Sequence, residues 1–217
     1  MIGIVVALEK EAIAVLPLIK NKNEKLLAGK KVIEGKLFGK DIALIFSGIG
    51  KVSAALSTQA LIDNYNLEYV FNFGSVGAVN QKIKVNQFYL VDKCMQFDFD
   101  VREIDDVPLG YIQDYDRVFF ETSPIDAKLE RATLGTSDKF TSKSEIIEEI
   151  IDCGIDIRDM EGSAIAQTCI SNDVKLIILK GVTDIYGSGN DGEQFIKNLI
   201  AVSNNFPTAI EEIFKSL

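Results

Sequence analysis

The sequence predicts an α/β protein, a three-layer α/β/α sandwich around a mixed, mainly parallel central sheet. Continuous apolar runs at residues 2–7, 69–73 and 175–182 are typical of strands buried on both faces of such a sheet. Stretches with helical periodicity alternate with these runs, and the turn triplet Gly39-Lys40-Asp41 joins two further apolar runs as a hairpin. With 217 residues, 47 % of them apolar, the chain fits a single domain over residues 1–217.

The predicted elements follow one another regularly along the chain. The first strand leads into a predicted helix through about residue 18, with Glu9 and Glu11 in its first turn, where the helix dipole favours anions. Residues 96–122 form a long, polar, weakly periodic segment, and a loop of that length is usually functional or disordered. The other predictions are hairpin strands at 32–38 and 42–46, strands at 88–95 and 130–135, and helices at 51–64, 144–152, 162–171 and 191–217, the last kinked or restarted at Pro207.

Composition excludes several classes of partner. A net charge of −9 argues against nucleic acid and anionic membrane surfaces, since both are bound by clustered lysine and arginine. No apolar run approaches the roughly 20 residues that span a bilayer, and the charges after the first strand do not fit a signal peptide. Cys94, Cys153 and Cys169 are odd in number and scattered, which favours free thiols in a cytoplasmic protein.

The sequence contains no histidine, and this limits the chemistry further. Every mechanism that needs an imidazole is excluded, including Ser-His-Asp and Cys-His hydrolysis. Three dispersed cysteines offer no zinc-ligand spacing, so we expect neither a metal nor a cofactor. Acid–base chemistry must then come from carboxylates, lysine, tyrosine or cysteine.

Polar side chains follow several predicted strands. Glu161 lies where a short extended segment turns into a helix, and Asp184 follows the last apolar strand. Glu11 comes just after the first strand, and Ser75 lies in a glycine-flanked turn after another. Because open α/β sheets bind ligands at the carboxyl ends of their strands, these residues are candidates for one site. Each has a simpler alternative, since an acid or a serine at the start of a helix is often only a cap.

Two glycine pairs also follow strands. Gly48 and Gly50 precede a helix, as in a dinucleotide-binding turn, but Ser53 occupies the third glycine position and no ribose-binding acid follows at the usual distance. The same turn lacks the upstream glycine of a P-loop. Its simpler interpretation is a tight turn that lets the helix pack against the sheet. Around Gly74 and Gly77, backbone amides could come close to a ligand.

Five motifs occur along nearly the full length of the chain. They are IGIVVALEKEA at the amino terminus, SGIGKVSAA from Ser47, NFGSVGA from Asn72, DMEGSAIAQ from Asp159, and GVTD ending at Asp184. In this order they resemble the 5′-methylthioadenosine/S-adenosylhomocysteine nucleosidases of the nucleoside phosphorylase superfamily. The resemblance implies a nucleoside phosphorylase-like fold and hydrolysis of the N-glycosidic bond between adenine and a 5′-thio-substituted ribose.

The resemblance also implies roles for individual residues. Asp184 matches the general acid that protonates adenine N7, Glu11 the general base for the attacking water, and Glu161 the group that bonds the ribose 2′ and 3′ hydroxyls. To hold its proton near neutral pH, Asp184 should have a pKa raised by burial above its usual value of roughly 4. The remaining implied contacts are Met160 against the ribose, Phe140 and Thr141 at the adenine, Thr183 beside the acid, and Phe195 in the 5′ pocket. Independently of the resemblance, Ser75 in its glycine turn can donate to a hydroxyl.

The chain departs from the usual pattern of these nucleosidases at four places. Phe97 stands where a histidine commonly precedes Asp98-Phe99-Asp100, and Gly77-Ala78 replaces a more usual Gly-Gly and leans slightly toward the phosphorylases. Residues 136–140 read Thr-Ser-Asp-Lys-Phe in place of Ser-Gly-Asp-x-Phe. Lys180 stands where an arginine is usual, and lysine lacks the bidentate fork of arginine. These changes bear on the 5′ substituent and on efficiency more than on the glycosidic chemistry.

Other functions stay open from the sequence. A phosphorolytic purine nucleoside phosphorylase would need cations for phosphate where the chain has Glu9-Lys10-Glu11 and Lys51, which favours hydrolysis. A futalosine-type nucleosidase is barely distinguished, and a non-catalytic nucleoside-binding protein is disfavoured because all three acids are kept. The resemblance implies a homodimer in which one subunit helps to close the neighbour's 5′ pocket, and residues 96–122 are the candidate contact.

Overall fold

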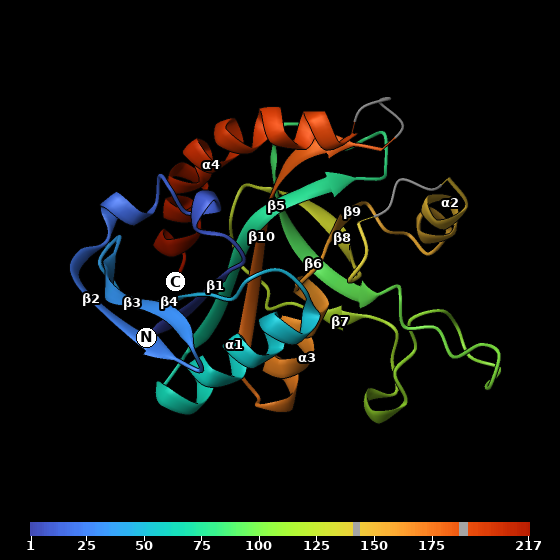
Figure 1. Cartoon of the computed structure of the whole chain (residues 1–217), viewed down its shortest axis with the longest axis horizontal. Coiled ribbons are helices and arrows are strands. Elements are labelled where there is room, and N and C mark those ends of the chain that lie inside the picture. Colours follow the sequence, from blue (N-terminus) through green and yellow to red (C-terminus); the bar gives the residue numbers. More distant parts are fainter. Residues whose placement is uncertain (141–143, 187–190) are drawn as a thin grey trace.

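The structure, a computed structural model, describes residues 1–140, 144–186 and 191–217. Across these residues ten strands form one mixed sheet (Figure 1). The strands are β1 (Ile2–Val6), β2 (Lys20–Leu27), β3 (Lys30–Leu37), β4 (Lys40–Phe46), β5 (Tyr69–Ala78), β6 (Phe88–Gln96), β7 (Phe120–Glu121), β8 (Glu130–Thr136), β9 (Ile157–Asp159) and β10 (Lys175–Ile185). The helices are α1 (Lys51–Asn64), α2 (Ser144–Asp152), α3 (Gly162–Ser171) and α4 (Asp191–Lys215), with 3₁₀ turns η1 (Glu9–Glu11), η2 (Leu16–Leu18) and η3 (Gln113–Tyr115).

The strand pairings close on themselves at one end of the sheet. The order is β10-β6-β8-β9-β5-β1-β4-β3-β2, with β7 beside β6, and β10 also pairs with β5. A closed circuit therefore runs through β5, β10, β6, β8 and β9, which the sequence did not predict. Among the described strands, five pairings are parallel and five antiparallel. The sheet is mixed, as predicted. Strand β3 runs against both β2 and β4, β6 runs against β10, and β9 runs against β5, while the longest ladder, between β5 and β10, is parallel.

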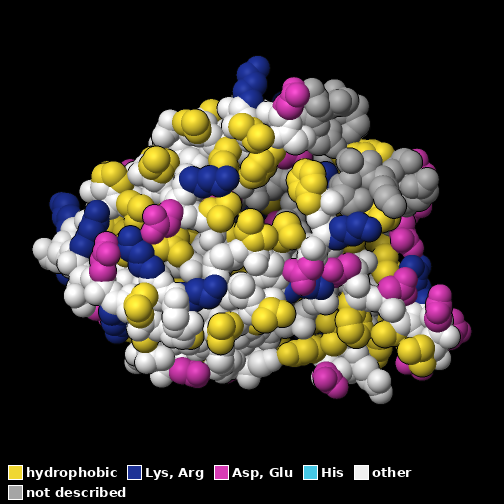
Figure 2. Space-filling view, in the orientation of Figure 1, with side chains coloured by type: hydrophobic (Ala, Val, Ile, Leu, Met, Phe, Trp, Pro, Cys, Tyr) yellow, Lys and Arg dark blue, Asp and Glu magenta, His cyan; other side chains and the backbone are white. Residues whose placement is uncertain are grey.

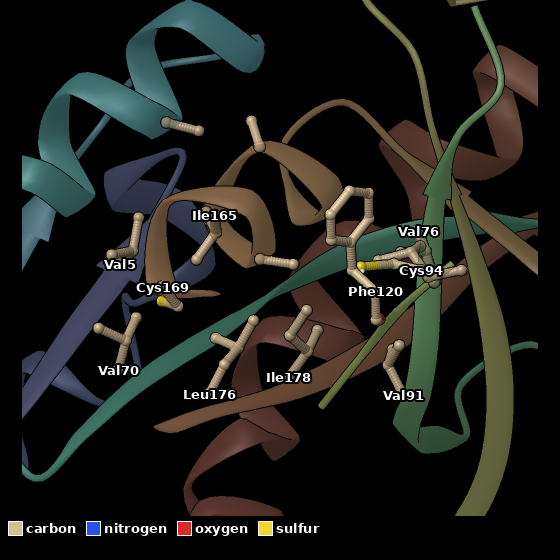
Figure 3. Close-up of a cluster of buried hydrophobic side chains, with 14 of the residues drawn as sticks. Val5, Val70, Val76, Val91, Cys94, Phe120, Ile165, Cys169, Leu176 and Ile178 are labelled. Carbon is tan, nitrogen blue, oxygen red and sulfur yellow. Dashed lines mark hydrogen bonds between the residues drawn. The ribbon is translucent and has the colours of Figure 1, made fainter. Parts of the chain in front are cut away.

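Helices cover both faces of the sheet. Successive side chains of β1 belong alternately to two apolar clusters, one on each face. Ile4 and Val6 belong to an apolar cluster that includes residues of α4, whereas Val5 belongs to a second cluster that includes residues of α1 and α3. Successive strand residues point to opposite faces, so the two clusters lie on opposite sides of β1. Figure 3 shows the second cluster, in which Ile165 of α3 faces the strands that carry Val5 and Val70. This packing on both sides fixes the strands that carry the site.

Strands β5 and β10 are longer than predicted. They pair in parallel from Tyr69 to Ala78 and from Lys175 to Ile185, with an irregularity between Val182 and Asp184. The apolar run of β5 ends at Gly74-Ser75 and that of β10 at Thr183-Asp184, yet the ladder of pairs continues past both. The residues expected in loops beyond the strands therefore lie within two paired strands, where their positions are fixed by the register.

The amino-terminal region differs from the prediction. The expected helix over residues 8–18 is wrong, since only η1 and η2 form there. Pro17 in η2 has no amide to donate to a helical ladder, and the amide of Leu8 is bound by the Glu11 side chain. The next element, β2, was not predicted because its polar, exposed residues show no buried face. It forms the open edge of the sheet, where lysines protect against pairing with other chains.

Residues 96–122 and helix α4 lie in the later part of the chain. Residues 96–122 hold only the end of β6 and the short elements η3 and β7 among irregular chain, as the weak periodicity predicted. Helix α4 continues through Pro207 and does not restart there. None of the helices in the described ranges is long and apolar enough to cross a bilayer.

Candidate active site

A cavity of about 340 Å³ lies where β5, β9 and β10 meet the segment after β1. Its size falls within the range of small-molecule sites. Seven predicted residues line it: Glu11, Ser75, Phe140, Met160, Glu161, Asp184 and Phe195. Thr183 is fully buried beside Asp184 and does not line the cavity, and Thr141 lies outside the described residues. Three acids far apart in the chain thus surround one space.

Glu11 is held by three hydrogen-bond donors. Its Oε1 accepts hydrogen bonds from the amide (2.8 Å) and the hydroxyl (2.6 Å) of Ser75, and its Oε2 accepts one from the amide of Leu8 (3.0 Å). A side chain at residue 74 would crowd this carboxylate, since a Cβ on Gly74 would lie 3.1 Å from Oε1. Ser75 belongs to β5 and caps no helix, so the simpler interpretation of Ser75 as a cap is wrong. Its hydroxyl fixes the orientation of Glu11 instead.

Glu161 occupies the N-cap position of α3 without acting as a side-chain cap. The amide of Gly162 is bound by Asp159 Oδ2 at 2.9 Å, while Glu161 Oε1 accepts a hydrogen bond from the amide of Gly50 at 2.9 Å. Gly50 has a φ of +100°, a conformation that L side chains rarely adopt. The glycine turn after β4 therefore presents a backbone amide to a carboxylate on a distant element.

The surroundings of Glu161 favour its protonated form. Burial, reinforced by the negative charge of Asp159, raises the pKa of Glu161 to about 7. Lys180 and the amide of Gly50 act in the opposite direction and do not outweigh it. The carboxyl of Glu161 therefore changes its charge near neutral pH.

A buried ion pair lies at the cavity wall, which Asp159 lines. Lys180 Nζ is 2.9 Å from Asp159 Oδ2, and both side chains are almost completely inaccessible. Asp159 also accepts a hydrogen bond from the Thr136 hydroxyl (2.6 Å). Burial acts to lower the pKa of Lys180, but the charges of Asp159 and Glu161 outweigh it and raise that pKa. Lys180, at the position where an arginine is usual, therefore keeps a positive charge beside the acids.

Asp184 is 1 % exposed and is oriented by its neighbour. The Thr183 hydroxyl donates to Asp184 Oδ1 at 2.7 Å and also lies 3.1 Å from the carbonyl oxygen of Val76. Asn198 of α4 donates to the Thr183 carbonyl (2.8 Å), which ties the end of β10 to the helix. The position of the Asp184 carboxyl is thus fixed by β10, β5 and α4 together.

Apolar side chains complete the cavity wall. Phe140 is exposed at its edge. Phe195 of α4 is half-buried and lies beside Lys10, whose Nζ is 5.6 Å from the ring centroid. Met160 lies between Asp159 and Glu161 in sequence and lines the cavity as predicted.

Three charged residues that were not predicted for the site also line the cavity: Lys139, Arg158 and Asp159. Arg158 is the one with the weakest signal in the sequence. It is only 7 % exposed and lies in β9, opposite Gly77 of β5. Its neighbour Ile157 is fully buried in the apolar cluster, so Arg158 points to the other side of the strand. The available signal was a lone arginine between an apolar residue and the Asp-Met-Glu motif.

Comparison with known proteins establishes the family. The profile of the phosphorylase superfamily matches residues 1–215. This chain belongs to the phosphorylase superfamily. Its α/β fold is nucleoside phosphorylase-like.

Two proteins with similar sequences are both named 5′-methylthioadenosine/S-adenosylhomocysteine nucleosidase. The 5′-methylthioadenosine/S-adenosylhomocysteine nucleosidase of Buchnera aphidicola subsp. Schizaphis graminum (strain Sg) is 29 % identical over 100 % of this chain and 97 % of its own. That of Marinomonas sp. (strain MWYL1) is 27 % identical over 99 % of this chain and 98 % of its own.

Solved structures of the superfamily have the same fold. The nucleosidase of Neisseria meningitidis, in complex with methylthio-immucillin-A, superposes with a TM-score of 0.90 at 25 % identity, over 100 % of this chain and 99 % of that one. The nucleosidase of Colwellia psychrerythraea 34H, in complex with adenine, also gives a TM-score of 0.90, at 24 % identity, over 99 % of this chain and 95 % of that one.

Because the pKa of Glu161 is raised in the folded protein, we expect the free energy of unfolding to depend on pH. The unfolded chain releases this proton near the ordinary pKa of 4.5, whereas the folded protein holds it until about pH 7. The Glu161 contribution to the free energy of unfolding therefore falls as pH rises between these values and stays low above pH 7. Glu161→Gln has no such proton to lose. The free energy of unfolding of the variant minus that of wild type should therefore be about 2–3 kcal/mol larger at pH 8 than at pH 4.5. Urea unfolding at both pH values measures the gain, and an equal difference at the two would contradict it.

Proposed function

We propose that this protein is a nucleosidase that hydrolyses the N-glycosidic bond of 5′-methylthioadenosine and S-adenosylhomocysteine, releasing adenine and the 5′-thio-ribose. The observation that carries the proposal is the meeting of Glu11, Glu161 and Asp184 around one cavity of about 340 Å³, each held by different donors. The names of the similar superfamily members support the choice of substrate.

Asp184 is the proposed general acid. Adenine leaves poorly as an anion, so a proton delivered to N7 lowers the barrier for cleavage of the C1′–N9 bond. Asp184 lines the cavity with only 1 % of its surface exposed, so its carboxyl can reach a bound base while little water reaches the acid. The Thr183 hydroxyl keeps the carboxyl in one orientation before and after the proton is transferred.

Glu11 and Glu161 act on the sugar side. Glu11, oriented by Ser75 and Leu8, takes a proton from the water that attacks C1′. Glu161 accepts hydrogen bonds from the ribose 2′ and 3′ hydroxyls, and its negative charge stabilises the oxocarbenium-like transition state. Burial raises the pKa of Glu161 to about 7 despite the Gly50 amide and Lys180, so the ionised form that this role requires predominates only above about pH 7.

The other predicted residues form the walls of the proposed site. Phe140 stacks on the purine, Met160 packs against the ribose, and Phe195 lines the 5′ pocket, all from positions on the cavity wall. Thr141, outside the described residues, keeps its proposed backbone contact with adenine. We propose that residues 1–217 work as one cytoplasmic domain with a three-layer α/β/α architecture.

Hydrolysis is favoured over phosphorolysis by the charges around the cavity. Lys51, the cation that follows the glycine turn, is engaged by Asp98 (2.6 Å) and lies 3.9 Å from Asp138. The position near the first strand is occupied by the buried carboxylate of Glu11. A phosphate ion beside Glu11 and Glu161 would meet like charges, whereas a neutral water molecule would not.

A substitution of the proposed acid tests the activity. Asp184→Asn should lower kcat/KM for adenine release from 5′-methylthioadenosine by about 10²–10⁴-fold, since the amide cannot deliver a proton. Asp173→Asn is the matched control, because residue 173 is exposed and has a φ of +54° that asparagine tolerates. Chromatography of the sugar product with and without phosphate completes the test. Formation of a ribose 1-phosphate, or full activity of Asp184→Asn, would contradict the proposal.

We also propose a homodimer. Apolar side chains gather over α1 and the 96–122 segment on the face shown in Figure 2. Val52 and Leu56, one turn apart on α1, are 80 % and 49 % exposed, and Ile104 of the 96–122 segment is 82 % exposed. An exposed apolar surface of this kind marks an interface, and its neighbour Ile49 lines the cavity, so a second subunit would lie close to the site.

The double variant Val52→Asp/Leu56→Asp should separate the subunits, because buried charges would replace the apolar contact. Light scattering at micromolar concentration should give twice the mass of one chain for wild type and the mass of a single chain for the variant. Ile200→Asp changes an equally exposed isoleucine on α4 and should leave the dimer intact. A monomeric wild-type protein would rule the dimer out.

A further inference from the structure

A buried arginine lies next to the proposed general acid. Gly77 of β5 pairs with Arg158 of β9 on one side and with Asp184 of β10 on the other. The three residues thus form one row across neighbouring strands, with a glycine in the middle. Both flanking residues line the cavity and are less than 10 % exposed.

The two side chains share the space above Gly77. A Cβ built on Gly77 would lie 2.7 Å from Asp184 Oδ2 and 3.3 Å from Arg158 Nε. The carboxyl and the guanidinium group therefore approach the same point from opposite sides. Any larger residue at position 77 would push them apart or out of the cavity.

Arg158 also contacts the aromatic wall of the cavity. Its guanidinium carbon is 5.4 Å from the centroid of the Phe140 ring, within the range of a cation–π contact. This inference rests on the proposed function, in which Phe140 stacks on the purine and Asp184 protonates N7. Arg158 thus adjoins both groups that would bind the base.

The hydrogen-bonding groups of arginine determine which purine substituent Arg158 can bind beside Asp184. On the purine edge, the group next to N7 is the substituent at position 6, which is an amino donor in adenine and an oxygen acceptor in hypoxanthine or guanine. Arginine carries five donors and no acceptor, and its characteristic partners on a purine are O6 and N7. A guanidinium group beside the N7 acid therefore matches an oxygen at position 6.

We propose that Arg158 donates a hydrogen bond to O6 of a 6-oxopurine, so that the site hydrolyses 6-oxopurine 5′-thioribonucleosides as well as the adenine compounds. Water attacks C1′ and gives a proton to Glu11, while the electron pair of the C1′–N9 bond passes to the purine. Asp184 transfers its proton to N7, so the base leaves as neutral hypoxanthine, and the hydrogen bond from Arg158 to O6 stabilises the electron density that builds up on the purine before that proton arrives. Adenine offers Arg158 no acceptor at position 6, so Arg158 acts differently on the two bases.

The test compares 5′-methylthioinosine with 5′-methylthioadenosine as substrates of wild type and of Arg158→Met. Wild type should release hypoxanthine, and Arg158→Met should lower the ratio of the two kcat/KM values, inosine over adenosine, by about 10-fold or more. Arg158→Lys keeps one donor and should give an intermediate ratio. Arg131→Met removes an exposed arginine paired with Asp92 and should leave the ratio unchanged.

The outcomes separate this inference from the proposed function. Release of adenine without hypoxanthine, or the same ratio in wild type and Arg158→Met, overturns the role of Arg158 and leaves the nucleosidase in place. Failure of both substrates overturns the nucleosidase itself. If Arg158→Met does not fold, calorimetric binding of hypoxanthine and adenine to wild type and Arg158→Lys decides. Weakened hypoxanthine binding alone supports the role, and equal changes for the two bases refute it.

Discussion

Carboxylates crowded around a small cavity repel one another, and the structure of this protein is arranged around that constraint. Each acid is held by its own donors, Glu11 by Ser75 and Leu8, Glu161 by the Gly50 amide, and Asp184 by the Thr183 hydroxyl. The different donors give the acids different environments, which is how one site keeps an acid and a base apart. Without these contacts, the cost of burying like charges would drive the side chains away from the cavity.

The fold supplies the donors from backbone far apart in the chain. The turn after β4 presents its amide through a glycine with positive φ, and β5 runs past the carboxylate of Glu11 with a glycine at residue 74. The Lys180–Asp159 ion pair places a positive charge behind Glu161, and the same aspartate binds the amide that begins α3. Lys180 thus supplies a positive charge at this place, although it lacks the bidentate fork of an arginine.

The sequence predicted the buried strands, the helices α1 to α4 and the convergence of the three acids, because apolar periodicity and motif order are local signals. It failed where tertiary pairing decides the outcome. The polar strand β2 forms only because β3 offers an edge, β5 and β10 continue through glycines because they pair with each other, and residues 8–18 form no helix because Glu11 turns inward. Arg158 was missed because a single charge in a three-residue strand gives no pattern, and its meeting with Asp184 depends on strand order.

The most direct test of the account is a crystal structure with a non-hydrolysable adenine nucleoside analogue that keeps a hydrogen-bonding group at position 7. The account predicts that this group lies about 2.6–3.2 Å from the Asp184 carboxyl, with the ribose hydroxyls on Glu161 and a water molecule between Glu11 and C1′. A purine bound with position 7 facing away from Asp184, or a ribose that contacts neither glutamate, would contradict the account.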